Sequence, residues 1–138
     1  MIIIVNPRRE LFRSGCLDIV YKFLYIHRVK ALIWVGSSLH DVRQFPPRAR
    51  QGMGFQLYKV QNGLEPSDWK PMPSVGPGVR EIRVHADREY RVMYIAQFEE
   101  AVYVLHAFIK KTAQTTTHDI DLAAQRFRDI HRSRRGKT

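Results

Sequence analysis

The sequence has little cysteine, no long apolar run and few acidic residues. Cys16 is the single cysteine in 138 residues, so the chain has neither a disulfide framework nor a cysteine-based zinc site. No apolar run approaches the roughly 20 residues that a membrane helix needs. Arg8 and Arg9 follow directly after the apolar start, an order that does not fit a signal peptide. We therefore expect a cytoplasmic protein that makes no membrane contact.

Acidic residues are outnumbered, and the excess positive charge gathers at the two ends of the chain. The sequence holds 23 Lys and Arg against 13 Asp and Glu, a formal net charge of +10. Residues 1–29 carry five basic and two acidic residues, and residues 126–138 carry six and one. This balance indicates a polyanionic partner. The basic tail over 133–138 is either a solvated terminus or a nucleic-acid contact.

Hydrophobic periodicity predicts one α+β domain. It has the order β-α-α-β-β-β-α, a small antiparallel or mixed sheet with a helical hairpin and a C-terminal helix. The expected strands cover 31–35, 79–85, 90–98 and a segment from 101, and the expected helices cover 39–44, 49–61 and 119–131. Residues 64–78 read as a stiff loop, and 2–5 as a short strand at most. The domain is expected over 30–132, preceded by an extension of unknown role over 1–29 and followed by the basic tail.

The segment that begins at Ala101 is the centre of this pattern. Its first eight residues are almost wholly apolar, β-branched or aromatic, which is typical of a strand buried on both faces. Lys110 and Lys111 follow, and because successive residues of an extended chain point oppositely, we expect one of the two to face a phosphate. The same alternation places Arg80 and Arg83 on opposite faces of the strand 79–85. It does not decide which of them belongs to a site.

Several ordered segments resemble the RelE/ParE toxin superfamily, most closely the phage-related, HigB-like toxins of type II toxin–antitoxin systems. The matching segments are Trp34-Val35-Gly36-Ser37-Ser38, Gly63-Leu64-Glu65-Pro66, Trp69-Lys70-Pro71-Met72-Pro73, Val79-Arg80-Glu81-Ile82-Arg83, Tyr90-Arg91-Val92 with Tyr94, His106-Ala107-Phe108 with Lys110-Lys111-Thr112, and Asp119-Ile120-Asp121-Leu122-Ala123. They follow one another in the right order within a run from about Ala31 to Asp129, which covers about 70% of the chain. Residues 1–29 have no counterpart.

The resemblance implies a ribosome-dependent mRNA endonuclease, neutralised by a small helix-turn-helix antitoxin. Such enzymes need no metal or other cofactor: a ribose 2′-hydroxyl attacks the adjacent phosphate and leaves a 2′,3′-cyclic phosphate. Stabilising the phosphorane requires cations. By analogy Arg91, Lys111 and His118 are expected to be catalytic. His118 is the titratable residue in the region where many relatives have a Tyr or His, and it is the candidate general acid. The residues expected to bind RNA phosphates are Lys70, Arg80, Arg83 and Lys110. His106 is expected to be structural, and His85 to be exposed.

Two other functions fit the same sequence. ParE-like relatives of this fold inhibit DNA gyrase and carry no nuclease site. A non-catalytic, phage-derived module that binds RNA or protein through its basic ends is the other alternative. The set of Arg and Lys residues around the expected sheet favours the RNA-cleaving function over the gyrase inhibitor.

Overall fold

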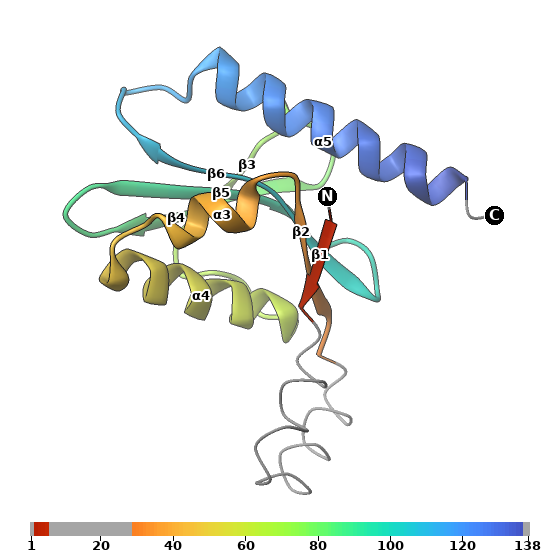
Figure 1. Cartoon of the computed structure of the whole chain (residues 1–138), viewed down its shortest axis with the longest axis horizontal. Coiled ribbons are helices and arrows are strands. Elements are labelled where there is room, and N and C mark those ends of the chain that lie inside the picture. The colour runs from red at the N-terminus through yellow and green to blue at the C-terminus, as the bar shows by residue number, and fades with distance from the viewer. Residues whose placement is uncertain (1, 6–28, 137–138) are drawn as a thin grey trace, which may run out of the picture.

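The computed structural model of the chain describes residues 2–5 and 29–136, and in this part the fold is α+β as predicted. A mixed sheet of six strands, in the order β1-β2-β6-β5-β4-β3, lies between helices on both faces (Figure 1). The elements are β1 (Ile2–Val5), β2 (Ala31–Val35), α3 (Ser38–Arg43), α4 (Pro47–Gln61), β3 (Trp69–Pro71), β4 (Val79–His85), β5 (Glu89–Ile95), β6 (Ala101–Lys110) and α5 (Thr117–Arg135). None of the helices in these ranges has the length and apolarity to cross a membrane.

β6 is the strand around which the sheet is built. It pairs with β2 in parallel on one side and with β5 in antiparallel fashion on the other. Val102, Val104 and Leu105 are fully buried, because helices cover both faces of the strand. The prediction of a doubly buried strand near the middle of the sheet is therefore confirmed, as is the antiparallel meander of β4, β5 and β6.

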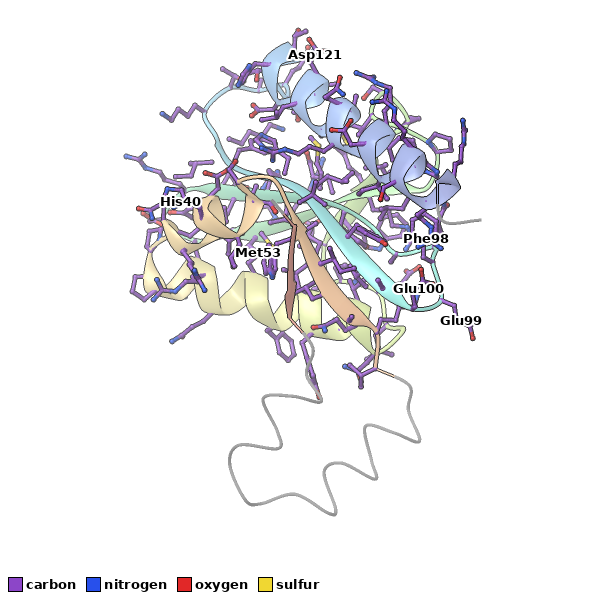
Figure 2. All side chains as sticks on the ribbon, turned by 45° about the vertical axis from the view of Figure 1, so that its right-hand side comes forward. His40, Met53, Phe98, Glu99, Glu100 and Asp121 are labelled. Carbon is purple, nitrogen blue, oxygen red and sulfur yellow. The ribbon has the colours of Figure 1, made fainter. Side chains whose placement is uncertain are left out.

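The two faces of the sheet carry separate hydrophobic cores. α3 and α4 cover one face, where Met53 and Leu57 of α4 pack against the side chains of Ile82 and Val92. Met53, labelled in Figure 2, is fully buried in this layer. α5 covers part of the other face, where Ala123 and the neighbouring apolar residues of α5 pack on the sheet. We refer to these two faces as the α4 side and the α5 side.

α5 is held at both its start and its middle by polar contacts. The Thr116 hydroxyl accepts a hydrogen bond from the Asp119 backbone N–H at 3.2 Å and donates one to the Asp119 carboxylate at 2.5 Å, so Thr116 caps the N-terminus of α5. Further along, Arg126 donates to the Leu105 carbonyl at 2.8 Å and to the Ser37 hydroxyl at 2.9 Å. These bonds fix the helix across the end of β2 and the middle of β6.

The structure differs from the prediction in three boundaries. The expected loop over 64–78 contains β3, which is too short to show a periodic pattern and is held by backbone pairing with β4. β5 ends at Ile95, because Phe98 leaves the sheet and packs edge-on against Tyr103. α5 continues to Arg135, where basic side chains suit the negative end of the helix dipole. The predictions for residues 6–28 and 137–138 lie outside the described residues.

Candidate functional site

Charged side chains gather on the α5 side of the sheet, beyond the part that α5 covers. Met93 belongs to the α5-side core and therefore identifies the face. Because side chains two residues apart in a strand point to the same face, Arg91 lies on the same side as Met93. From β3 to β6 the register forms three rows: Lys70, Glu81, Met93 and His106; Arg83, Arg91 and Phe108; and His85, Glu89 and Lys110. We call Lys70, Arg83, Arg91 and Lys110 the cationic cluster. Lys70, Arg83 and Lys110 are among the residues predicted to bind RNA phosphates, and Arg91 is one of the predicted catalytic residues.

Glu81 lies in the middle of the cationic cluster and is fully buried. One of its carboxylate oxygens, Oε1, lies 3.6 Å from the Nε atoms of both Arg83 and Arg91. Neither oxygen has a hydrogen-bond partner among the described residues. Since Arg83 and Arg91 face each other directly across β4 and β5, the carboxylate between them offsets the repulsion of two like charges. Glu81 thus positions the two arginines.

Arg91 is the least accessible member of the cluster, with 6% of its side chain exposed. It donates to the Tyr90 carbonyl at 3.0 Å and to a Glu89 carboxylate oxygen at 3.0 Å. Its guanidinium therefore braces β5 in this state, and contact with a phosphate requires the Glu89 bond to open. Arg83 is more exposed and carries the freer guanidinium.

Lys110 is the lysine that faces the cluster. It is the last residue of β6 and pairs with Glu89, whereas Lys111 follows the end of the strand and is exposed. Burial, followed by repulsion from Arg91, lowers the pKa of Lys110. A lysine of lowered pKa transfers a proton more readily than an ordinary lysine, and in its protonated form it still donates to a phosphate.

His85 connects the cluster to two carboxylates. Its Nε2 lies 2.6 Å from Asp68 Oδ2, and its Nδ1 lies 2.5 Å from Glu89 Oε2. Carboxylates only accept hydrogen bonds, so the doubly protonated ring satisfies both contacts. The bond to Asp68, with that to Glu89, raises the pKa of His85 against the opposing effect of burial. Burial acts to raise the pKa of Glu89, but the bonds from Arg91 and His85 outweigh it and lower that pKa.

The remaining predicted residues lie away from the cluster. Arg80 points to the α4 side, where its guanidinium stacks 4.1 Å above the Trp69 ring and pairs with Glu65. The structure thus selects Arg83 over Arg80 for the face that holds the cluster. His118 is exposed in the first turn of α5 and makes no hydrogen bond or ion pair to any described residue.

His106 is a buried residue under the N-terminal turn of α5. Its Nε2 lies 2.7 Å from Asp119 Oδ1, and its ring stacks on Phe108 with centroids 5.2 Å apart. Burial lowers the pKa of His106, although Asp119 opposes this. The ring links β6 to the helix that covers it, as expected of a structural histidine.

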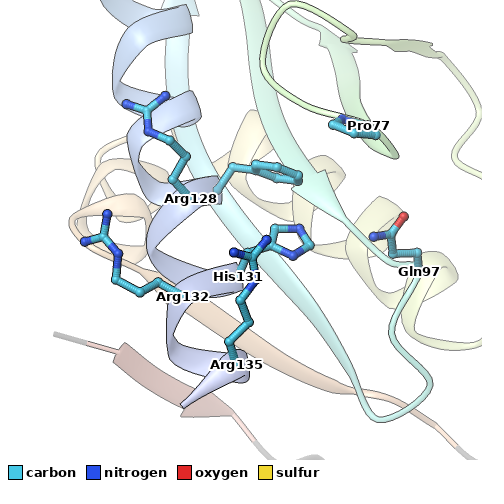
Figure 3. A pocket seen from close by; sticks show the side chains of 7 residues that line it. Pro77, Gln97, Arg128, His131, Arg132 and Arg135 are labelled. Atoms are coloured by element: carbon cyan, nitrogen blue, oxygen red, sulfur yellow. The ribbon is translucent and has the colours of Figure 1, made fainter. Parts of the chain in front are cut away.

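A second basic surface lies on the C-terminal half of α5. Arg128, His131, Arg132 and Arg135 line a pocket with Gln97 at its far side (Figure 3). The pocket has a volume of about 490 Å³. Part of the basic tail expected from the sequence is therefore a helical face, because α5 continues through Arg135.

The sequence did not single out Glu81, His85, Glu89 or Asp68 as site residues. The alternation of β4 already put Glu81 and His85 on one face with Arg83, and this was the available signal. Asp68 is on no periodic element and reaches His85 only through the fold. Within the described ranges, no three His, Cys, Asp or Glu side chains are arranged to hold a metal ion.

The model of the phage-derived Gp49-like proteins (DUF891) matches residues 40–128. The chain belongs to this family. The Gp49-like proteins are RelE-like and toxin-like, which supports the predicted superfamily at this coarser level. The Gp49-like segment runs from α3 into α5 and contains the whole cationic cluster, whereas β1, β2 and the last turns of α5 lie outside it. No curated protein matches the chain.

Proposed function

We propose that this Gp49-like protein is the toxin of a toxin–antitoxin pair and cleaves mRNA on the ribosome. The observation that carries the proposal is the cationic cluster: four cations from four adjacent strands converge on one partly open face. Only two carboxylates, Glu81 and Glu89, lie in the same rows, so the face holds positive charge in excess. Convergent Arg and Lys side chains match the charge of a pentacoordinate phosphorane.

The chemistry needs a phosphate clamp and two proton transfers. Arg83 and Lys110 supply exposed or half-exposed cations for the scissile phosphate, with Lys70 on the neighbouring strand gripping the RNA backbone. The 2′-oxygen forms the new bond to phosphorus as the bond to the 5′-oxygen breaks, leaving a 2′,3′-cyclic phosphate. The lowered pKa keeps Glu89 ionised, so its carboxylate is available to accept the 2′-hydroxyl proton, although as a weaker base than a carboxylate of ordinary pKa.

A proton donor for the leaving 5′-oxygen stands in the same row. The raised pKa of His85 favours its charged form near neutral pH, and Asp68 orients the ring. His85 therefore takes the general-acid role that was expected of His118. Lys110, in the same row, takes the role given to Lys111.

The chain itself offers two matched pairs for the test. The first pair is Arg83→Gln and Arg80→Gln, which each remove one positive charge, but from opposite faces of β4. The second pair is Lys110→Gln, at the last residue of β6, and Lys111→Gln, at the residue that follows the strand. Each variant is expressed from a tight promoter, and mRNA cleavage is mapped on ribosomes by primer extension. We expect Arg83→Gln and Lys110→Gln to lose at least 100-fold in cleavage, because each removes about 3 kcal/mol of charge stabilisation from the transition state. Arg80→Gln and Lys111→Gln should cleave within threefold of the wild type.

Two outcomes would exclude the proposal. Growth arrest with intact mRNA and an induced SOS response would favour the ParE-like gyrase inhibitor. Arrest that survives Arg83→Gln but not removal of the α5 arginines would favour a non-catalytic binding module. A helix-turn-helix antitoxin encoded beside the gene, and action in the cytoplasm, belong to the same proposal. Co-expression of that neighbouring gene should restore growth.

A further inference from the structure

A pocket of about 400 Å³ opens on the α4 side of the sheet, away from the cationic cluster. It lies between the C-terminal end of α4 and the adjoining ends of β4 and β5. Arg80 and Tyr94, which pair across these two strands, both line it. Because they alternate with Glu81 and Met93, this pocket and the cluster are on opposite faces. The nuclease proposed above makes no use of it.

Tyr94 is the residue that marks the pocket as a binding site. Its side chain is 1% exposed, and its hydroxyl has no hydrogen-bond partner among the described residues. A buried hydroxyl without a partner costs roughly 1–3 kcal/mol. Burial raises the pKa of Tyr94 despite the nearby Arg80 guanidinium, so the hydroxyl keeps its proton and can donate. Tyr94 lines the pocket beside the Arg80 guanidinium, so a ligand that fills the pocket offers this hydroxyl an acceptor.

The charges around the hydroxyl favour a single negative charge in the ligand. Lys30 donates to the Ala96 carbonyl at 2.6 Å and retains two further N–H groups. Arg80 pairs with Glu65 at 3.4 Å, and the Glu65 side chain is more exposed than the Arg80 side chain. Two cations and one carboxylate therefore line the pocket.

Apolar side chains line the pocket on the side of α4, where Val60 and Leu64 belong to its wall. The exposed large apolar residues of the described chain are Phe55, Tyr58 and Leu64, all on α4 or directly after it. The Leu64 N–H bonds the Lys59 carbonyl, and the Gly63 N–H bonds the Val60 carbonyl. In this C-terminal motif the residue in the place of Leu64 commonly packs against the last helical turn. The pocket thus has an apolar margin on the side of α4.

We propose that this pocket binds a carboxylate side chain of a partner protein's acidic, apolar peptide segment. The Tyr94 hydroxyl, Arg80 and Lys30 donate to the carboxylate, and Leu64 contacts the apolar residue beside it. A peptide satisfies both the charge and the apolar margin, whereas the phosphate backbone of RNA offers only the charge. The exposed Glu65 at the mouth also repels a polyanion more than a single carboxylate.

The test uses the full chain and two fluorescein-labelled peptides, (Gly-Leu-Glu-Phe)₃ and (Gly-Leu-Gln-Phe)₃, with binding followed by anisotropy. We expect the Glu peptide to bind the wild type at least tenfold more tightly than the Gln peptide. Tyr94→Phe, which keeps the ring, should weaken the Glu peptide about tenfold, because it removes one hydrogen bond to a charged group. Arg88→Gln, at the exposed β4–β5 turn, should bind within twofold of the wild type.

Stability and cleavage provide the second readout. Tyr94→Phe removes an unpaired buried hydroxyl, so its melting temperature without peptide should equal or exceed that of the wild type. Its mRNA cleavage should be unchanged, which separates a failure here from a failure of the nuclease proposal. Equal binding of the Glu and Gln peptides would overturn the inference, as would equal binding by wild type and Tyr94→Phe. If a single-stranded RNA dodecamer displaced the peptide, the pocket would belong to RNA and the inference would be overturned. The same holds if the wild type formed a dimer that Tyr94→Phe dissociates, because the occupant would then be a second copy of the chain.

Discussion

Replacing Glu81 by glutamine tests whether this buried carboxylate holds the arginine pair together. The substitution keeps the size of the side chain and removes its charge. Arg83 and Arg91, directly opposite each other, then lose the anion that lies 3.6 Å from each Nε. Arg91 retains its bond to Glu89, but Arg83 has no other carboxylate within ion-pair distance in the described chain.

The magnitude follows from the burial of the pair. At 3.6 Å and an effective dielectric constant of about 20, each contact is worth roughly 5 kcal/mol before desolvation is subtracted. Removing one partner of a buried ion pair costs about 3–5 kcal/mol in the free energy of unfolding. For a chain of this size, that corresponds to a fall in melting temperature of roughly 10–15 °C. Glu81→Gln should therefore be folded at 25 °C but much less stable.

Urea unfolding followed by circular dichroism measures this loss. Glu65→Gln is the matched control, because it removes the exposed partner of the other arginine on β4 and should cost less than about 1 kcal/mol. The double variant with Arg83→Gln should recover at least about 1 kcal/mol, since one of the two repelling charges is gone. A cost below 1 kcal/mol for Glu81→Gln, or no recovery in the double variant, would refute the role assigned to Glu81.

Two further predictions concern the contacts of β6 and α5. The pKa of His106 is lowered in the fold, so its stabilising effect is present above about pH 6.5 and is lost as the pH falls through the folded value. The melting temperature should differ less between pH 7.5 and pH 5.0 for His106→Gln than for the wild type or for His40→Gln. An equal difference in all three proteins would contradict this role of His106. Gly36→Ala should cost roughly 2–4 kcal/mol in urea unfolding, because φ is +59° and the added Cβ would lie 2.6 Å from the Arg126 Nε. Gly63→Ala shares the positive φ without any collision and should cost about half as much; similar losses would show that Arg126 moves aside freely.

The cationic cluster shows how far alternation predicts a site and where it fails. Alternation correctly placed Arg80 and Arg83 on opposite faces of β4, because strand side chains alternate whatever their partners are. It did not choose between the members of each pair. That choice depends on which face α5 covers, and packing between distant segments decides this.

Asp68 and Glu89 illustrate the same limit for the proton-transfer groups. Glu89 lay in the predicted turn, and Asp68 lay in the predicted loop. Only the pairing of β3 with β4 and of β4 with β5 brings both carboxylates to His85. A local pattern cannot report such contacts, because 17 residues separate Asp68 from His85.

The sequence by itself determined the α+β class, the three successive strands before the last helix and the two lysines at the end of a buried strand. These depend on local hydrophobic period, turn residues and hydrogen bonds within a few positions. The tertiary structure decided that Lys110 and Arg83 face the cluster, that Glu81 is buried between two arginines, and that Tyr94 lines a pocket on the other face. These depend on burial and on charges brought together from separate strands, and only the assembled sheet defines them.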